Sequence, residues 1–455
     1  MMATQGQPGN EIAIADVIDR SKIGSLQIGL FALCAACLIM DGFDVQAVGY
    51  VGPSLLREWK VPGSALGNML AAGNSGVLVG SLLFTMLADK IGRRPVLIGA
   101  TFYFSVMTIL TALVTSTEQM IAVRFIAGLG LGCIIPNATA LIGEYSPRRL
   151  RVTLMACISV GFTAGAALGG FLSAWLIPAF GWRSVFFFGG TTPLVIGAAM
   201  VMWLPESLQF MALRQKDPRR LAIWIKRIDP SVPATAASRY VVHEENRGGV
   251  PAMHLFRDGR ALGTVLLWVI NFMNIFNLYV LSGWMPTVAE KLGYSTRVSV
   301  LVGTTVQVGG TLGTFWLTFL IGRLGFVRVL TTCFAVACLS IALIGQPGLS
   351  LWLLILLVFI AGSCVVGGQP TINALSGSYY PTYLRSTGIG WGLGIGRAGA
   401  IVGPWLVGQL SDAKWEITDI FYVAAVPALI SAVVMLSLQW VMKPASAAAV
   451  PVAAH

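Results

Sequence analysis

The sequence predicts an all-α membrane protein whose twelve transmembrane helices form two six-helix halves related by pseudo-symmetry. Three observations support this prediction: the composition, the length and number of apolar segments, and an internal repeat. The 455 residues are 56% hydrophobic and only 11% charged, whereas soluble proteins carry about 25% charged residues. A chain with so few charges is expected to lie in a bilayer, which also excludes disordered, coiled-coil and collagen-like proteins.

The apolar segments are each about 20 residues long, enough to cross about 30 Å of hydrocarbon as a helix. We predict spans at about 27–50, 65–88, 95–114, 119–143, 152–178, 182–204, 261–285, 298–321, 327–345, 350–376, 386–410 and 418–441. They group into an N-terminal bundle (27–204) and a C-terminal bundle (261–441), separated by a central loop (205–260) and flanked by tails (1–26 and 442–455).

The distribution of positive charge predicts the orientation. The central loop is rich in basic residues, namely Arg214, Lys216, Arg219, Arg220, Lys226, Arg227, Arg239, Arg247, Arg257 and Arg260. Because cytoplasmic loops carry an excess of Lys and Arg, we expect this loop and both tails on the cytoplasmic side of the cytoplasmic (inner) membrane. The 30 Lys and Arg do not gather into one basic patch, so the net charge of +11 does not indicate nucleic acid binding.

Cysteine and histidine offer no cofactor or metal site. The seven Cys lie inside apolar segments, and the three His (His243, His254 and His455) fall in loops or at the terminus. A disulfide framework is therefore not expected, and no His is available for proton transfer within the membrane. Any proton carrier there must be a carboxylate.

An internal repeat relates the two halves. Residues 136–153 align without gaps on residues 370–387 at an offset of 234, and nine of the 18 positions are identical. Span four thus corresponds to span ten. A parallel duplication of a six-span unit is the pattern that builds transporters with a midplane site between two halves.

Three charged residues share a similar depth in the first half. Asp41 and Asp44 lie about 14 to 17 residues into span one, or about 20 to 25 Å from the cytoplasmic edge, and a spacing of three places them on one helix face. Arg124 lies about five residues into span four, which runs in the opposite direction. Because a charge at the bilayer centre costs about 2.5 to 3.5 kcal/mol, we expect a buried ion pair. A purely structural pair is the alternative for Arg124, whereas two carboxylates that resist double ionisation predict a proton carrier.

Arg397 lies near the middle of span eleven, in Gly392-Leu-Gly394-Ile-Gly396-Arg397-Ala-Gly399, with no acidic residue in the same span. A planar guanidinium binds a carboxylate through two parallel hydrogen bonds, and the surrounding glycines allow a ligand to approach. We interpret it as the ligand of a substrate carboxylate, with an unidentified structural partner as the alternative. The Gly-x-Gly-x-x-Gly spacing lacks a preceding strand, so a nucleotide site is rejected.

Other polar and aromatic residues lie near the expected midplane. Phe43, Tyr279 and Trp391 are candidates to stack on a flat substrate, although most aromatic residues in such proteins pack or lie at membrane interfaces. Asn271 and Asn274 belong to a polar stripe in span seven. We expect this stripe to face a cavity or another helix.

The loop between spans two and three resembles a motif of the major facilitator superfamily. It reads Thr85-Met-Leu-Ala-Asp89-Lys90-Ile-Gly92-Arg93-Arg94, against the family pattern Gly-x-x-x-Asp-Arg/Lys-x-Gly-Arg-Arg/Lys, and departs only at Thr85. In that family the loop helps to latch the two halves together on the cytoplasmic side. The resemblance therefore implies the major facilitator fold and a gating role for Asp89, Gly92 and Arg93.

The end of span four also resembles this superfamily. Glu144-Tyr-Ser-Pro-Arg-Arg-Leu-Arg151 matches its acidic and basic turn, and the resemblance implies an ion pair between Glu144 and Arg151 that forms in one state and breaks in another. The second half keeps Arg385 but has Ser378 in place of the acid, so we expect Arg385 to find a partner in the first half.

Within the superfamily, Asp41-Gly-Phe-Asp44 and the segment from Gly394 to Pro404 resemble the aromatic acid:proton symporter family, which imports benzoate-like anions with protons. The functional residues of that family match Asp41, Asp44, Asp89, Arg124, Glu144 and Arg397. The loop between spans eight and nine departs from it by lacking an acid, which puts the latch of the second half in doubt.

These observations lead to one hypothesis and two alternatives. The hypothesis is a monomeric symporter for a small aromatic carboxylate and a proton, without a cofactor, in which Asp41 and Asp44 carry the proton and Arg397 binds the carboxylate. A symporter for a non-aromatic organic acid or polyol is the nearest alternative. A membrane sensor or enzyme is disfavoured, because the central loop is too short and too poor in motifs for a catalytic or signalling domain.

Overall fold

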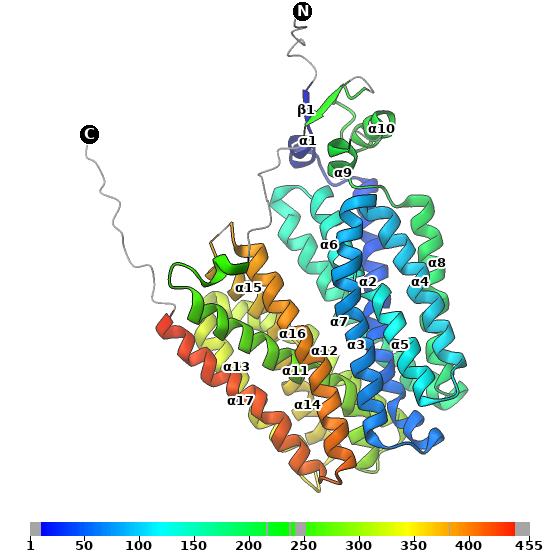
Figure 1. Cartoon of the computed structure of the whole chain (residues 1–455), viewed down its shortest axis with the longest axis vertical. Helices are drawn as coiled ribbons and strands as arrows, with labels where there is room; N and C mark the ends of the chain where they lie inside the picture. The colour runs from blue at the N-terminus through cyan, green and yellow to red at the C-terminus, as the bar shows by residue number, and fades with distance from the viewer. Residues whose placement is uncertain (1–10, 215–216, 236–237, 242–251, 382, 442–455) are drawn as a thin grey trace, which may run out of the picture. The chain divides into compact units, whose positions relative to one another are not determined.

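The computed structural model describes residues 11–214, 217–235, 238–241, 252–381 and 383–441, which are almost entirely helical (Figure 1). The elements are β1 (Glu11–Ala13), α1 (Ile14–Arg20), α2 (Ser25–Trp59), α3 (Gly63–Ile91), α4 (Arg93–Leu113), α5 (Thr117–Leu131), α6 (Ile134–Tyr145), α7 (Arg148–Phe180), α8 (Arg183–Trp203), α9 (Leu208–Leu213), α10 (Pro218–Ile228), β2 (Arg239–Val241), the 3₁₀ helix η1 (Ala252–Phe256), α11 (Ala261–Lys291), α12 (Thr296–Leu324), α13 (Phe326–Ile344), α14 (Leu351–Val365), α15 (Gly368–Tyr379), α16 (Arg385–Asp412) and α17 (Ile417–Val441). The C-terminal tail predicted at 442–455 lies outside the described residues.

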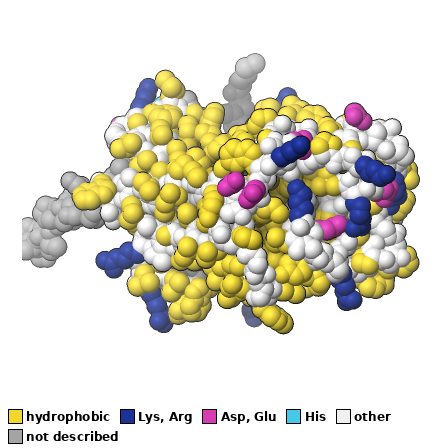
Figure 2. All heavy atoms as spheres, turned by 90° about the horizontal axis from the view of Figure 1, so that it is seen from below, with side chains coloured by type: hydrophobic (Ala, Val, Ile, Leu, Met, Phe, Trp, Pro, Cys, Tyr) yellow, Lys and Arg dark blue, Asp and Glu magenta, His cyan; other side chains and the backbone are white. Residues whose placement is uncertain are grey.

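Eleven of the predicted spans are helices long and apolar enough to cross a membrane among the described residues, with α5–α6 and α14–α15 each counted as one. The remaining predicted span is α16. It is 28 residues long but contains eight glycines and Arg397, which make it less apolar. Figure 2 looks from below onto the helix ends, where Lys, Arg, Asp and Glu lie among hydrophobic side chains. Along the helices, large hydrophobic side chains are exposed, including Val195, Trp352 and Trp440. Such a surface suits lipid rather than water.

The chain forms two compact units. The first contains α1 to α10, apart from the start of α3, together with residues 290–304 at the end of α11 and the start of α12. The second contains the remainder of α11 and α12, the later helices, and residues 62–67 at the start of α3. Each unit therefore takes in a short segment from the other half of the sequence.

The internal repeat extends to the helix boundaries. α5 ends at Leu131 and α6 begins at Ile134, whereas α14 ends at Val365 and α15 begins at Gly368. Both breaks are thus related by the offset of 234 found in the sequence. The predicted continuous spans four and ten are each divided in the structure. Pro136 and Pro370, each the third residue after a break, have no N–H to donate to the carbonyl four residues earlier, which favours an interruption of the helix at these places.

The described parts of the N-terminal segment and of the central loop form short helices and strands. β1 pairs in parallel with β2, and α1 and α10 bury Ile14, Ile18, Leu221 and Ile225 in one apolar core with the first bundle. Because α10 is apolar on this face and basic on the other, its burial follows from helical amphipathicity. The described part of the central loop up to Val241 therefore packs within the first unit, whereas η1 belongs to the second, where Leu255 packs with Leu267.

Candidate functional site

The first polar site lies inside the first unit, where α2, α4 and α5 meet. Arg124 Nη2 lies 2.8 Å from Asp44 Oδ2, and Nη1 lies 3.2 Å from Oδ1. The Thr108 hydroxyl donates to Asp44 Oδ1 over 2.7 Å. Asp44 is 0% and Arg124 3% exposed, so the predicted buried ion pair is confirmed. The Arg124 guanidinium also lies 5.9 Å from the centre of the Phe186 ring, within reach of a cation–π interaction.

Close packing of α7 fixes this part of α2. Gly42 lies between the two aspartates, and a Cβ there would overlap the carbonyl of Phe162 on α7. Asp41 is also buried, one turn before Asp44. The Phe43 ring packs against Gly169 and Gly189 and is 4% exposed. In this structure Phe43 therefore fills the space between α7 and α8, and not a position open to a substrate.

The second polar site lies in the second unit, around Arg397 of α16. Arg397 is partly buried and makes no hydrogen bond or ion pair with any residue that the structure describes. Glycines 392, 396, 399 and 403 bring α16 against α11, where a Cβ at Gly392 would meet Asn271 and one at Gly403 would meet Phe276. Residue numbers rise in the same direction along both helices from one contact to the next, so α11 and α16 run parallel. Arg397 therefore lies at the level of Asn274 and Ile275.

The predicted polar stripe of α11 forms an amide cluster with α15. Asn274 Nδ2 donates to Gln369 Oε1 over 2.8 Å and to the Val365 carbonyl over 3.0 Å. Gln369 Nε2 in turn donates to Asn271 Oδ1 over 3.1 Å and to Asn373 Oδ1 over 3.3 Å. The helix break before Gly368 leaves the Val365 carbonyl available, because the N–H of Gln369 bonds to Val366 instead.

The two other aromatic candidates make no hydrogen bond to this cluster among the described residues. Trp391 stacks on Trp268, with 5.9 Å between ring centroids and 24° between the planes, and is 49% exposed. Trp391 is therefore held against α11 by stacking, with about half of its side chain exposed, and its contact with a substrate stays a prediction. Tyr279 is partly buried on α11 and has no hydrogen-bond partner among the described residues.

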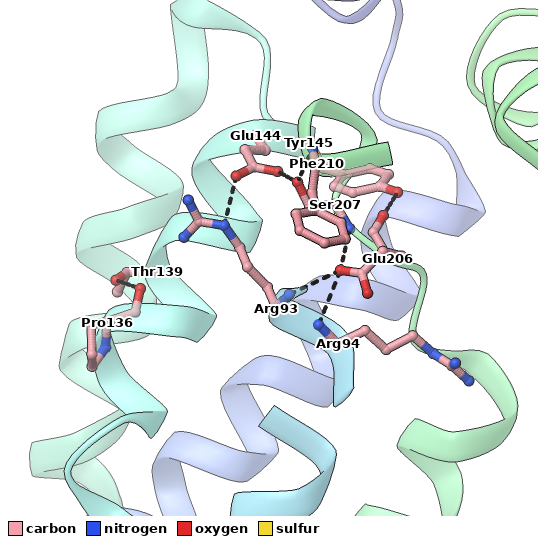
Figure 3. A network of polar contacts seen from close by, with 9 residues as sticks. All are labelled: Arg93, Arg94, Pro136, Thr139, Glu144, Tyr145, Glu206, Ser207 and Phe210. Carbon is pink, nitrogen blue, oxygen red and sulfur yellow. Dashed lines mark hydrogen bonds and ion pairs between the residues drawn. The ribbon is translucent and has the colours of Figure 1, made fainter. Parts of the chain in front are cut away.

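A third polar network joins the end of α6, the start of α4 and the chain after α8 (Figure 3). Arg93 Nε lies 2.8 Å from Glu144 Oε1, and the Ser207 hydroxyl donates to Glu144 Oε2. Glu144 is almost fully buried, and Arg93 is partly exposed. In this structure Arg93, and not Arg151, forms the ion pair with Glu144, and the pair of Glu144 with Arg151 expected in one state of the cycle stays a prediction. Arg151 instead donates to the Ser146 carbonyl over 3.3 Å.

Glu206 anchors the loop motif from the other side. Its Oε1 accepts from the backbone N–H groups of Arg93 and Arg94 over 3.0 and 3.1 Å, capping the start of α4. Gly92 has φ of 110°, and a Cβ there would lie 2.5 Å from Glu206 Oε2. Glycine is thus required both by the backbone and by the carboxylate. The Arg94 side chain donates to the carbonyls of Leu204 and Val201 at the end of α8.

Two predicted gating residues have no partner here. Asp89 is exposed and makes no ion pair within the part of the chain that the structure describes. Arg385 is likewise exposed at the start of α16, and its expected pairing with the first half stays a prediction. Of the loop motif, Gly92 and Arg93 therefore take part in the polar network, and Asp89 does not.

Sequence reasoning missed four contributors: Thr108, Glu206, Ser207 and Gln369. Thr108 and Gln369 are neutral residues in apolar spans, where hydroxyl and amide groups are common. Glu206 and Ser207 lie at the start of a polar loop, where acidic and hydroxyl residues are common and do not by themselves indicate a specific contact. For Ser207 the local signal was available, because its hydroxyl accepts from the Phe210 N–H as an N-cap of α9.

Comparison with known proteins identifies relatives along nearly the whole chain. The family model described as Major Facilitator Superfamily matches residues 34–258 and 267–454. A 4-hydroxybenzoate transporter of Pseudomonas putida is 34% identical over 435 residues, which make up 95% of this chain and 97% of the relative. A gallate transporter of Pseudomonas putida is 34% identical over 427 residues, covering 94% of this chain and 95% of the relative.

A solved structure of the xylose transporter from E. coli, in a partially occluded inward open conformation, has the same fold. Its TM-score is 0.71 at 15% sequence identity, and the match covers 92% of this chain and 98% of that one. At this identity the likeness concerns the fold alone.

Proposed function

The chain belongs to the major facilitator superfamily, and we propose that it is a symporter that imports an aromatic carboxylate of the benzoate or hydroxybenzoate class together with a proton. It is a multi-pass membrane transporter and not an enzyme. Relatives named as 4-hydroxybenzoate and gallate transporters support the substrate class. In this proposal the chain works as a monomer in the cytoplasmic membrane, with both termini inside.

The observation that carries the proposal is Arg397. A cation within a predicted span is costly unless it is paired or solvated, and Arg397 has no anionic partner among the described residues. A carboxylate is the ligand that suits a guanidinium best, through two parallel hydrogen bonds. The substrate anion itself would thus complete the pairing of Arg397 during transport.

The proton is assigned to Asp41 rather than Asp44. Asp44 is held by both terminal nitrogens of Arg124 and by Thr108. Protonating it would leave the buried Arg124 without a counter-charge, and breaking such a pair costs about 3 to 5 kcal/mol. Asp41 lies one helical turn away on the same face of α2. In this proposal the Asp44–Arg124 pair positions α2, and Asp41 binds and releases the proton.

The coupling has a direct energetic reason. A negative cell interior opposes inward movement of a singly charged anion by about 2.3 kcal/mol at 100 mV. One proton moving with the anion cancels that opposition, and an inward pH gradient then adds to the driving force. A buried carboxylate and a buried guanidinium are sufficient chemistry for this cycle.

Cytoplasmic gating is assigned to the loop motif and its neighbours: Asp89, Gly92, Arg93, Glu144, Arg151 and Arg385. The bond from Arg93 to Glu144 ties the α3–α4 turn to the end of α6. Because Arg151 follows on the same turn as Glu144, it is the natural second partner when Arg93 moves away. Asp89 and Arg385, both exposed here, are proposed to pair in another state of the cycle.

The test of the substrate class is uptake into proteoliposomes. Purified protein is reconstituted, labelled 4-hydroxybenzoate is added, and unlabelled aromatic acids, aliphatic acids and polyols are compared as competitors. Competition by aromatic carboxylates alone is the expected result. Uptake that aliphatic acids or polyols block equally well would contradict the aromatic assignment and favour the alternative substrate classes.

A further inference from the structure

We propose that the amide cluster of Asn271, Asn274 and Gln369 recognises a ring hydroxyl of the substrate, with Asn274 Oδ1 as the acceptor and Gln369 as a positioning residue. The inference rests on the proposed function, because it concerns which aromatic carboxylates are preferred. It narrows the substrate class from aromatic acids in general to hydroxylated ring acids.

The orientation of the Asn274 amide is fixed by the backbone. Its nitrogen lies 3.0 Å from the Val365 carbonyl oxygen, which can only accept a hydrogen bond. The nitrogen of the amide must therefore point toward Val365, and the oxygen must point away from it. The same nitrogen also donates to Gln369 Oε1, so both of its hydrogens are used.

The other end of the cluster is fixed in the same way. Asn271 Nδ2 donates to the Leu267 carbonyl over 3.0 Å, which leaves Asn271 Oδ1 facing Gln369. Gln369 must then present its nitrogen to Asn271 and its oxygen to Asn274, as observed. Two backbone carbonyls thus determine every amide orientation along the cluster.

One acceptor is left over by this arrangement. Asn274 Oδ1 is buried and has no hydrogen-bond partner in the described structure, and the residue as a whole is 2% exposed. A buried polar atom without a partner costs about 1 to 3 kcal/mol. Since the orientation is fixed, the missing partner must be a donor, and an ether or a second carbonyl would not serve.

The cluster and Arg397 lie at matching heights. Asn274 is 13 residues after the first residue of α11, and Arg397 is 12 residues after the first residue of α16. The two helices run parallel and are in contact through Gly396, which lies against Ile275 and Asn271. A guanidinium and an amide carbonyl at one level of the same unit suit the two ends of a hydroxylated ring acid.

The test compares ligands in the unaltered protein. Labelled benzoate serves as the transported reporter in proteoliposomes, and the competitors are 3- and 4-hydroxybenzoate, their methoxy counterparts, and unlabelled benzoate. At least one hydroxy acid should compete about ten-fold or more better than its methyl ether, because only the hydroxyl donates to Asn274 Oδ1. Hydroxy and methoxy acids that compete equally at both ring positions would overturn the inference.

Variants then assign the effect to the cluster. Asn274→Leu and Gln369→Leu should each abolish the preference for hydroxyl over methoxy, measured as the ratio of the two competitor concentrations that halve whatever benzoate uptake each variant shows. The matched control is Asn277→Leu, on the same helix, whose amide, oriented so that its nitrogen donates to the Ala424 carbonyl over 2.7 Å, faces α17. This control should keep the preference. A cluster variant that keeps the preference overturns the inference.

The two proposals fail in different ways. If the unaltered protein transports neither benzoate nor hydroxybenzoate, the aromatic assignment is wrong and the inference falls with it. If it transports both and treats hydroxy and methoxy acids alike, only the inference is wrong. Should Asn274→Leu not fold, the ligand comparison in the unaltered protein still decides.

Discussion

Asp44 of α2 and Arg124 of α5 form a bidentate ion pair, with 2.8 Å between Nη2 and Oδ2 and 3.2 Å between Nη1 and Oδ1. Both side chains are buried, and Thr108 adds a further hydrogen bond to the carboxylate. The pair therefore joins three helices of the first unit by charge as well as by packing. Removal of the pair should therefore lower the free energy of unfolding more directly than it lowers the rate of transport.

Asp44→Asn should destabilise the protein by about 3 to 5 kcal/mol, because Arg124 would remain buried without a counter-charge. The free energy of unfolding in mixed detergent micelles measures this loss. The double variant Asp44→Asn/Arg124→Gln removes both charges and should recover a large part of the stability. A double variant that is as unstable as the sum of the two single changes would show that the pair is not coupled.

Substitution of Arg397 should weaken substrate binding and leave the unbound protein stable. We expect the dissociation constant for 4-hydroxybenzoate to rise about ten-fold for Arg397→Lys, which loses the two-pronged geometry, and about a hundred-fold for Arg397→Gln. Titration of the purified protein measures both values. Arg323→Gln, an exposed change at the end of α12, is the control. If Arg397→Gln lowers the thermal stability of the unbound protein instead, the arginine has a structural partner.

Glu206→Ala should destabilise the start of α4. The carboxylate accepts from the N–H groups of Arg93 and Arg94, and loss of an N-terminal cap costs about 0.5 to 2 kcal/mol. Glu206→Gln keeps an acceptor oxygen and should cost less. Thermal unfolding of both variants provides the comparison. Equal losses for Ala and Gln would mean that the hydrogen bonds contribute little and the negative charge is what matters.

Arg93→Gln and Arg151→Gln should differ in their effect on stability, although both arginines lie near Glu144. Removal of Arg93 leaves the buried Glu144 carboxylate without its cation, at a cost of about 1 to 3 kcal/mol. Removal of Arg151 loses a 3.3 Å bond to the Ser146 carbonyl and a weaker attraction to Glu144, so it should cost less stability than removal of Arg93. Thermal shift assays on both variants separate them. A larger loss of stability for Arg151→Gln than for Arg93→Gln would instead support the pair of Glu144 with Arg151 that the sequence predicts.

The sequence was sufficient to predict an ion pair where the charges within the membrane allowed one arrangement. Opposite charges at one depth of a bilayer are expected to pair, so the sequence predicts that Arg124 pairs with an aspartate of span one. Only the structure shows that the partner is Asp44 and not Asp41. Glu144 had two basic residues within reach of its turn, and only the tertiary position of α4 favours Arg93 over Arg151. Local sequence carries no information about that choice.

The amide cluster shows a second reason why prediction stopped short. The polar stripe of Asn271 and Asn274 was visible from its spacing, but its partner Gln369 lies on α15, more than 90 residues later. The helix break that frees the Val365 carbonyl falls at Gly367-Gly368-Gln369-Pro370, inside a segment that is apolar enough to be predicted as one span. The repeat offset of 234 relates this break to the one in span four, but it could be applied to the breaks only after the structure had given the helix boundaries.

The central claim is proton-coupled import that depends on Asp41. The most direct measurement is accumulation of labelled 4-hydroxybenzoate in proteoliposomes under an inward proton gradient, with and without a protonophore, for the unaltered protein and Asp41→Asn. We predict accumulation that the protonophore abolishes, and no gradient-driven accumulation in Asp41→Asn, which should still exchange internal for external substrate at equal pH. Gradient-driven accumulation that survives in Asp41→Asn would contradict the assignment, and accumulation that ignores the protonophore would contradict proton coupling itself.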